Sequence, residues 1–208
     1  LLDALPIFPA CETIGCFARV TDVGRKTDGE LKALRDLGYT GLSIGVETGH
    51  APSLRFMDKG YGPEDIVTQT RRLDGAGIRY HFMYLAGLPG AGHGAEGAAA
   101  SAEVFSRTNP KIIGSSMLTL FPESRLYREV QAGAWAEESE LEKLEEVRTL
   151  VEGLKIPVWF ATLGASNAVV VQGNLPEDRS VLLAKLDAAR KEGREEALRQ
   201  YRRNLPHL

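Results

Sequence analysis

The sequence lacks the features that mark membrane proteins, secreted proteins and nucleic-acid-binding proteins. No run of apolar residues is long enough to span a bilayer, and the 208 residues carry a formal net charge of only −3. The chain begins LLDALPIFPA, without an initiator methionine or the basic region of a secretory signal. We therefore expect a cytoplasmic protein with no membrane partner and no nucleic-acid partner. Because this start is typical of the end of a helix followed by a loop, we also expect a fragment of a larger domain.

Cysteine is scarce as well. Cys11 and Cys16 have four residues between them, a spacing that matches no zinc or iron–sulfur motif. Without a secretory signal we expect two free thiols rather than a disulfide. The four histidines lack metal-ligand spacing, and the chain contains no P-loop and no G-x-S-x-G nucleophile motif.

The composition, with 43% hydrophobic and 25% charged residues, is that of a globular protein with one large core or at most two small ones. The predicted strands cover residues 12–22, 41–47, 79–87, 111–121 and 156–164. The predicted helices cover residues 30–38, 62–77, 95–110, 141–154 and 180–203, and a polar loop covers 165–179. This alternation predicts an α/β fold with a parallel sheet, either doubly wound or a full or partial (β/α) barrel. In both architectures ligands bind at the carboxyl ends of the strands.

The strand in GLSIGVETG ends on a carboxylate. Leu42, Ile44 and Val46 alternate with small or polar residues, so we expect them to pack against helices. Glu47 then lies on the opposite face, at the carboxyl end of the strand. A carboxylate in that place can bind a ligand, although a solvated loop acid would give the same pattern.

Two basic residues are candidates for the same site. Lys59 follows Glu47 by one short helix and could bind a carboxylate there, the alternative being an exposed surface lysine. Arg19, near the end of the strand predicted at 12–22, is expected to face inward and to pair with Glu47 or with a ligand carboxylate. His81, which alternates with Met83, is expected on the inward face of its strand.

A glycine-rich turn after the strand at 79–87 offers a different interpretation. From Gly90 it has the sequence GAGHGA, a relaxed form of the dinucleotide-binding pattern placed between a strand and a helix. The acidic residue that such a site requires at the end of the next strand is missing, since the first acid there is Glu123. A nicotinamide-dependent oxidoreductase therefore stays open as an alternative, as does a non-catalytic binding module.

Four motifs occur in a specific order along the chain. They are GVET at 45–48, LRFMDKG at 54–60, GLPG at 87–90 and LFPESRLY at 120–127. Their order and spacing resemble the second half of the barrel of the radical S-adenosylmethionine (SAM) superfamily. The similarity is to the branch with oxygen-independent coproporphyrinogen oxidase and the Elp3/MiaB/NifB-type domain, and it covers residues 12–135.

The resemblance implies roles for four residues. Glu47 corresponds to a strand-end residue that hydrogen-bonds SAM, and Lys59 to the cation that holds the SAM carboxylate. Met83 matches a strand position that often carries a polar contact to the ribose, from which methionine departs. Arg19 is implied as an inward residue near SAM or substrate.

The resemblance also implies a cofactor that this sequence does not provide for. The superfamily binds a four-iron, four-sulfur cluster through C-x-x-x-C-x-x-C, which is absent here. We therefore expect a partial TIM-type barrel truncated at its N-terminus (residues 1–160) with a C-terminal helical extension (161–208). The parent enzyme would cleave SAM with an electron from a flavodoxin- or ferredoxin-type donor, on a substrate that the sequence does not specify. The fragment itself would bind no cluster and be inactive.

Overall fold

The computed structural model describes residues 7, 10 and 14–205 of the chain. The strands are β1 Ile14–Ala18, β2 Tyr39–Glu47, β3 Arg79–Ala86, β4 Ile112–Met117, β5 Val158–Thr162 and β6 Gln172–Leu175. The helices are α1 Val20–Gly24, α2 Asp28–Asp36, α3 Ala51–Phe56, α4 Pro63–Ala76, α5 Gly94–Phe105, α6 Arg125–Gln131, α7 Glu140–Gly153, α8 Arg179–Glu192 and α9 Glu195–Arg203.

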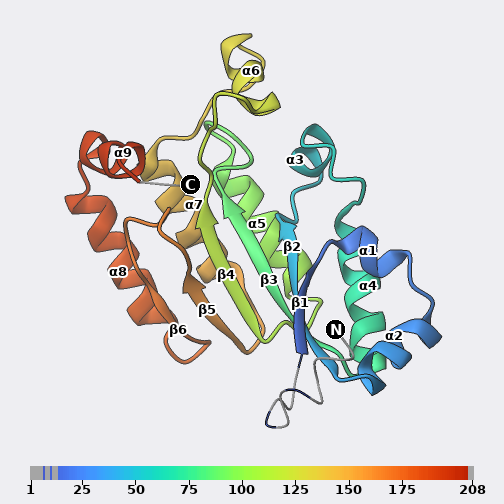
Figure 1. The fold of residues 1–208 in the computed structure, drawn as a ribbon. Coiled ribbons are helices and arrows are strands. Elements are labelled where there is room, and N and C mark those ends of the chain that lie inside the picture. Colours follow the sequence, from blue (N-terminus) through green and yellow to red (C-terminus); the bar gives the residue numbers. More distant parts are fainter. Residues whose placement is uncertain (1–6, 8–9, 11–13, 206–208) are drawn as a thin grey trace.

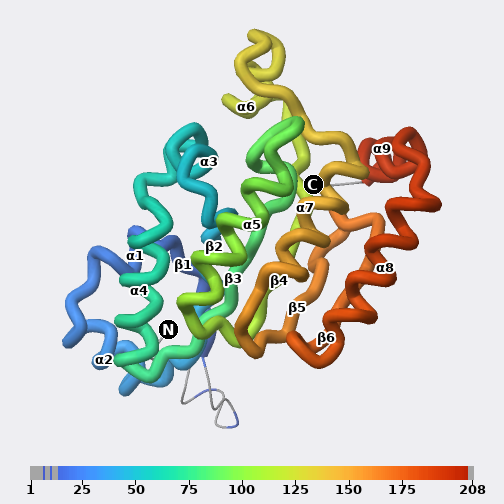
Figure 2. Tube along the Cα trace, turned by 180° about the vertical axis from the view of Figure 1, so that it is seen from behind, coloured from blue at the N-terminus to red at the C-terminus, as the bar shows by residue number. Residues whose placement is uncertain are grey.

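The six strands form a single sheet in sequence order. β1 to β5 are parallel, and β6 is antiparallel to β5. Helices α4, α5, α7 and α8 cover one face of the sheet, and in the described part of the chain the other face is open (Figures 1 and 2). α3 and α6 lie beyond the carboxyl ends of the strands (Figure 1). The expected α/β class with a parallel sheet is confirmed, and helices on one face only are the arrangement of a (β/α) barrel that is not closed here.

The two faces of the sheet separate the side chains as the sequence predicts. Ile44 and Val46 of β2 are buried beneath the helices, while Glu47 lies on the opposite, open face. On β3 the helix-facing side is aromatic, and the ring of Phe82 lies 5.0 Å from that of Phe105 in α5. The core is therefore built between sheet and helices, which leaves the open face available for polar groups.

The first strand is shorter than predicted. The prediction covered residues 12–22, but β1 ends at Ala18 and α1 begins at Val20; residues 12 and 13 lie outside the described part. The helix starts there because the Asp22 carboxylate accepts a hydrogen bond from the Arg19 amide at its N-terminus. β1 is also an edge strand, and its Phe17 is 85% exposed on the open face.

The C-terminal region also differs from the prediction. The loop expected at 165–179 contains β6, whose short Gln-Gly-Asn-Leu sequence gives no strand signal. The helix expected at 180–203 is divided into α8 and α9 at Gly193, a residue with low helix propensity. The division expected between residues 160 and 161 falls inside β5, and β6 continues the same sheet beyond it.

The loop after β2 is fixed to α5 by a buried hydroxyl pair. The Thr48 and Ser101 hydroxyl oxygens are 2.9 Å apart, and the Gly49 amide donates to the Ser101 hydroxyl at 2.7 Å. Loop and helix are so close that a side chain on Gly49 would begin 2.7 Å from the Ser101 Cα. Glycine is therefore required here by the close approach of two backbones.

The turn after β3 is fixed by a buried acid of α7. One Glu146 carboxylate oxygen accepts from the Tyr84 hydroxyl and the other from the Gly87 amide, both at 2.5 Å. Burial, followed by the nearby charge of Glu138, raises the pKa of Glu146 well above its ordinary value. This carboxyl group therefore joins the β3 strand, the turn that follows it and α7 at one buried point.

Glu138 lies beside this point, just before α7. It is 1% exposed, and neither carboxyl oxygen has a hydrogen-bond partner within the described residues. A side chain on Gly94 would begin 2.5 Å from its carboxyl group, so the acid lies directly beneath the turn. The pKa of Glu138 is raised to about 7, mainly by burial and in part by the Glu142 charge, while the Lys143 charge opposes the shift. The site therefore favours protonated carboxyl groups.

The close approach at Gly49 gives a prediction for stability. Replacing Gly49→Ala forces a methyl group against α5 and should lower the free energy of unfolding by about 1–3 kcal/mol. Gly75→Ala is the matched control, because Gly75 has open space around it in α4 and alanine favours a helix. Urea denaturation would measure both. Equal stability of the two variants would contradict the packing argument.

The buried acids give a prediction for pH. Between about pH 4.5 and 7 the folded protein holds a proton on Glu138 that the unfolded chain has already released. The free energy of unfolding should therefore fall as the pH rises through this window. Glu138→Gln, which is uncharged at every pH, should remove on the order of 1–3 kcal/mol of that loss.

Thermal unfolding between pH 4.5 and 8 would measure this effect, with the exposed Glu123→Gln as control. The control should keep the pH dependence of the unsubstituted protein. If Glu138→Gln keeps it too, Glu138 does not titrate as its burial indicates.

Candidate functional site

Glu47 and Lys59 meet at the carboxyl end of β2. Glu47 is the last residue of the strand, and Lys59 follows α3. The Lys59 Nζ lies 3.3 Å from the Glu47 Oε1. The side chains are 26% and 25% exposed, so both charges are accessible from solvent. The structure thus brings together the two residues that the sequence analysis placed at one site.

The backbone around Glu47 turns sharply to present its carboxylate on the open face. Glu47 has a φ of +58°, and the register with β3 shifts between Gly45 and Glu47. A side chain on Gly45 would begin 2.8 Å from the Glu47 Oε1, so the carboxylate folds back over Gly45. A left-handed conformation at a glutamate is a strained one that surrounding contacts must hold.

Tyr61 supplies such contacts. Its hydroxyl group lies 3.1 Å from the Gly45 carbonyl oxygen and 3.0 Å from that of Val46, to which it donates. Burial, followed by the negative charge of Glu47, raises the pKa of Tyr61 above its ordinary value, so the hydroxyl group remains a donor. The sequence analysis missed this residue, because a tyrosine after a helix has no periodic signal. Its position two residues after Lys59 was the available hint.

Met83 occupies the open face next to this pair. In the parallel register it lies opposite Gly45 on β2 and Gly114 on β4. Its sulfur lies 3.7 Å from where a Gly114 side chain would begin. The surface beside Glu47 is therefore apolar, with a thioether as a weak acceptor and no hydrogen-bond donor on this side chain. His81 lies on the same face of β3, as predicted.

The structure corrects the prediction made for Arg19. The predicted pair with Glu47 is wrong, because the Arg19 side chain is 69% exposed and its guanidinium binds Asp22, at 3.2 Å between Nη2 and Oδ1. This contact holds the pKa of Asp22 below its ordinary value. The inward alternation of β1 stops at Ala18, and Arg19 becomes the N-cap of α1 instead. Lys59 is the cation that Glu47 binds.

The glycine-rich turn does not support a dinucleotide site. In that motif the N-terminus of the helix receives a pyrophosphate. Here the Gly92 amide donates to the Glu142 carboxylate at 3.0 Å, and Glu138 lies against Gly94. Glu96 adds a third acid in the first turn of α5. Glu142 and Glu96 would therefore repel a phosphate, and the Gly92 amide that could bind one already donates to Glu142.

The described residues form neither a metal centre nor a membrane-spanning helix. Over residues 14–205 no group of three histidine, cysteine, aspartate or glutamate side chains is placed to hold a metal ion. Cys16 is a free, exposed thiol, and Cys11 lies outside the described residues. Within the same range, every helix is too short or too polar to cross a bilayer. The residues of this structure therefore do not fit a four-iron, four-sulfur cluster.

Comparisons by sequence find nothing for this chain: no protein-family profile and no curated protein sequence match it. Comparisons by structure find similar proteins. The archaeal Elp3 of Methanocaldococcus infernus matches with a TM-score of 0.64 and 19% identity over 88% of this chain. The radical SAM methyltransferase TsrM of Kitasatospora setae, solved with cobalamin and a [4Fe-4S] cluster, matches with a TM-score of 0.51 and 18% identity over 64% of this chain.

The chain is shorter than either of these proteins. It covers 42% of the Elp3 chain and 24% of the TsrM chain. At 18–19% identity the likeness concerns the fold, and it agrees with the order of motifs along the sequence. The chain has the α/β fold of the radical SAM enzymes.

Proposed function

We propose that this chain is the SAM-binding portion of a radical SAM enzyme, and that Glu47 and Lys59 bind the methionine part of SAM. The observation that carries the proposal is the accessible Glu47–Lys59 pair at the carboxyl end of a strand in this fold. In parallel α/β folds that end of the sheet is where ligands bind.

The charges of the pair are complementary to an amino acid. The methionine part of SAM carries an ammonium and a carboxylate group on one carbon atom. Lys59 would bind the carboxylate and Glu47 would accept hydrogen bonds from the ammonium group, so each side chain exchanges one charged partner for another. Tyr61, by holding the carbonyl groups of Gly45 and Val46, would keep the Glu47 carboxylate in place.

The remaining parts of the proposal concern the longer protein. We infer that its cluster is bound by a segment outside these 208 residues, and that this portion alone is inactive. With the cluster bound, such an enzyme cleaves SAM reductively to start radical chemistry. An electron donor of the flavodoxin or ferredoxin type and a cytoplasmic location belong to the same proposal, which leaves the substrate open.

SAM binding by this chain tests the first part. Isothermal titration should detect SAM binding that Glu47→Gln and Lys59→Met each weaken by about 10–100-fold, the cost of one charge-assisted hydrogen bond. Lys32→Met is the matched control, because Lys32 is an exposed lysine that pairs with Asp36. NADH in place of SAM should give no binding.

Two outcomes would contradict the proposal. If both variants unfold like the unsubstituted protein and bind SAM equally well, this pair is not the SAM site. If the chain binds SAM but the longer protein, reconstituted with iron and sulfide without oxygen, forms no 5′-deoxyadenosine with a strong reductant, the portion belongs to a binding module.

A further inference from the structure

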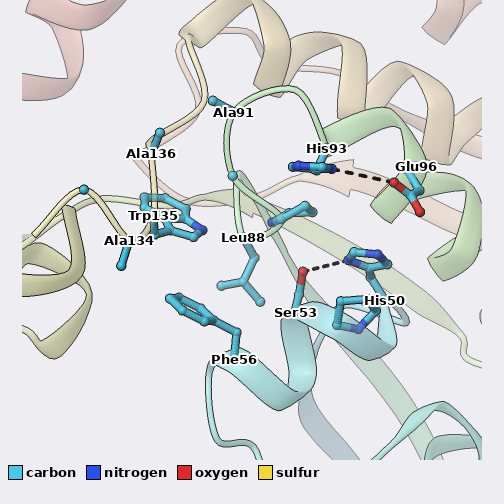
Figure 3. Close-up of a pocket in the computed structure, with 14 residues that line it drawn as sticks. His50, Ser53, Phe56, Leu88, Ala91, His93, Glu96, Ala134, Trp135 and Ala136 are labelled. Atoms are coloured by element: carbon cyan, nitrogen blue, oxygen red, sulfur yellow. Dashed lines mark hydrogen bonds and ion pairs between the residues drawn. The ribbon is translucent and has the colours of Figure 1, made fainter.

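A cavity lies away from the Glu47–Lys59 pair, between α3, the turn after β3 and the loop after α6. Its volume is about 560 Å³, within the range of small-molecule sites. Figure 3 shows Trp135 and Phe56 on one side, His50 and His93 on the other, and Leu88 between them. Neither Glu47 nor Lys59 lines this cavity, so it is a separate site.

The aromatic side is fixed by close packing. The Trp135 indole nitrogen would lie 2.7 Å from a side chain on Gly90, so the indole ring rests directly on the backbone of the turn. Gly90 has a φ of +87°, which favours glycine for a second reason. Phe56, the last residue of α3, lies on the same side (Figure 3). These two rings offer a preformed apolar surface that a flat group can contact.

The opposite side of the cavity is polar, and its acidic residue is Glu96. The His50 Nδ1 lies 2.8 Å from the Ser53 hydroxyl group, and burial lowers the pKa of His50, which keeps the ring neutral. The His93 Nδ1 lies 3.7 Å from the Glu96 carboxylate. Of the described residues that line the cavity, Glu96 is the acid and none is a lysine or an arginine.

The surroundings extend this charge pattern. The Glu142 carboxylate contacts the turn that forms the upper wall, where it accepts a hydrogen bond from the Gly92 amide. The basic group on the aromatic side is Arg125 of α6, whose guanidinium carbon lies 6.0 Å from the centre of the Phe56 ring. The histidine side of the cavity carries the Glu96 charge, partly opposed by Arg55 near His50, and the aromatic side is neutral to positive.

We propose that this cavity binds a small amine whose flat apolar tail lies against Trp135 and Phe56 and whose ammonium group lies at the Glu96 end. The tail removes apolar surface from water, and the ammonium group gains the carboxylate as a partner. A carboxylic acid of the same size would place its negative charge beside Glu96 and bind more weakly. The proposal is independent of SAM binding, because it uses none of the same residues.

Trp135 is a built-in reporter for the test. The chain has two tryptophans, and Trp159→Phe on the open face of the sheet leaves Trp135 as the remaining one. Fluorescence of this variant would be titrated with three probes that share a phenyl tail: 2-phenylethylamine, 2-phenylethanol and 3-phenylpropanoate. The amine should bind about 2–5-fold more tightly than the alcohol, because an exposed carboxylate contributes little, and the acid should bind most weakly.

Three further substitutions separate the charge from the apolar contact. Glu96→Gln should remove the preference for the amine, bringing its Kd to that of the alcohol, while Glu103→Gln on the same helix should leave the preference intact. Phe56→Leu should weaken the amine and the alcohol alike. Glu96 is 71% exposed, so its substitution leaves the fold unaffected. Equal affinity for the three probes, no binding of any of them, or an amine preference that survives Glu96→Gln would overturn the proposal.

Discussion

The attachment of two strand ends to the helix layer is the constraint on which the rest of this structure depends. The loop after β2 is held by the Thr48–Ser101 hydroxyl pair, and the turn after β3 is held by Glu146. Both contacts are buried, so each polar group has a partner that water cannot replace. Because the backbone after Val46 is fixed in this way, Glu47 is placed at the rim of the sheet in a conformation that it would not adopt alone.

The same attachment separates two environments. On the open face of the sheet, Glu47 and Lys59 form an accessible charge pair beside the apolar Met83. On the outer side of the same loop, His50 and the turn after β3 line a cavity with an aromatic wall. The end of β2 and the loop after it thus contribute residues to two different sites. One site is a pair of opposite charges, and the other is a cavity with an aromatic wall. The two sites can lie so near each other because the strand ends are held in place and the helices cover only one face of the sheet.

Much of this arrangement could be predicted from the sequence, because it rests on local patterns. Alternation along residues 41–47 placed Glu47 correctly, and the order of short motifs indicated the fold. The inward orientation predicted for Arg19 was wrong because the sequence gives no sign that the strand ends at Ala18 and that a helix begins directly after Arg19. Glu146 and Tyr61 were missed because their roles depend on tertiary contacts, although an acid on the apolar stripe of α7 was a signal for the first. β6 was missed because four residues with a glycine and an asparagine carry too little strand propensity.

The reversed direction of β6 has a consequence for how the sheet can grow. Five strands run the same way, and the sixth runs back along β5, so the repeat of parallel strand and helix stops at that edge. α8 packs beside β6 and covers it further (Figure 2). Strands that continue the parallel order have to join at β1, where Phe17 faces solvent on the inner side. Within the described residues, β1 is therefore the edge at which a further parallel strand could be added, and the β6 edge is not.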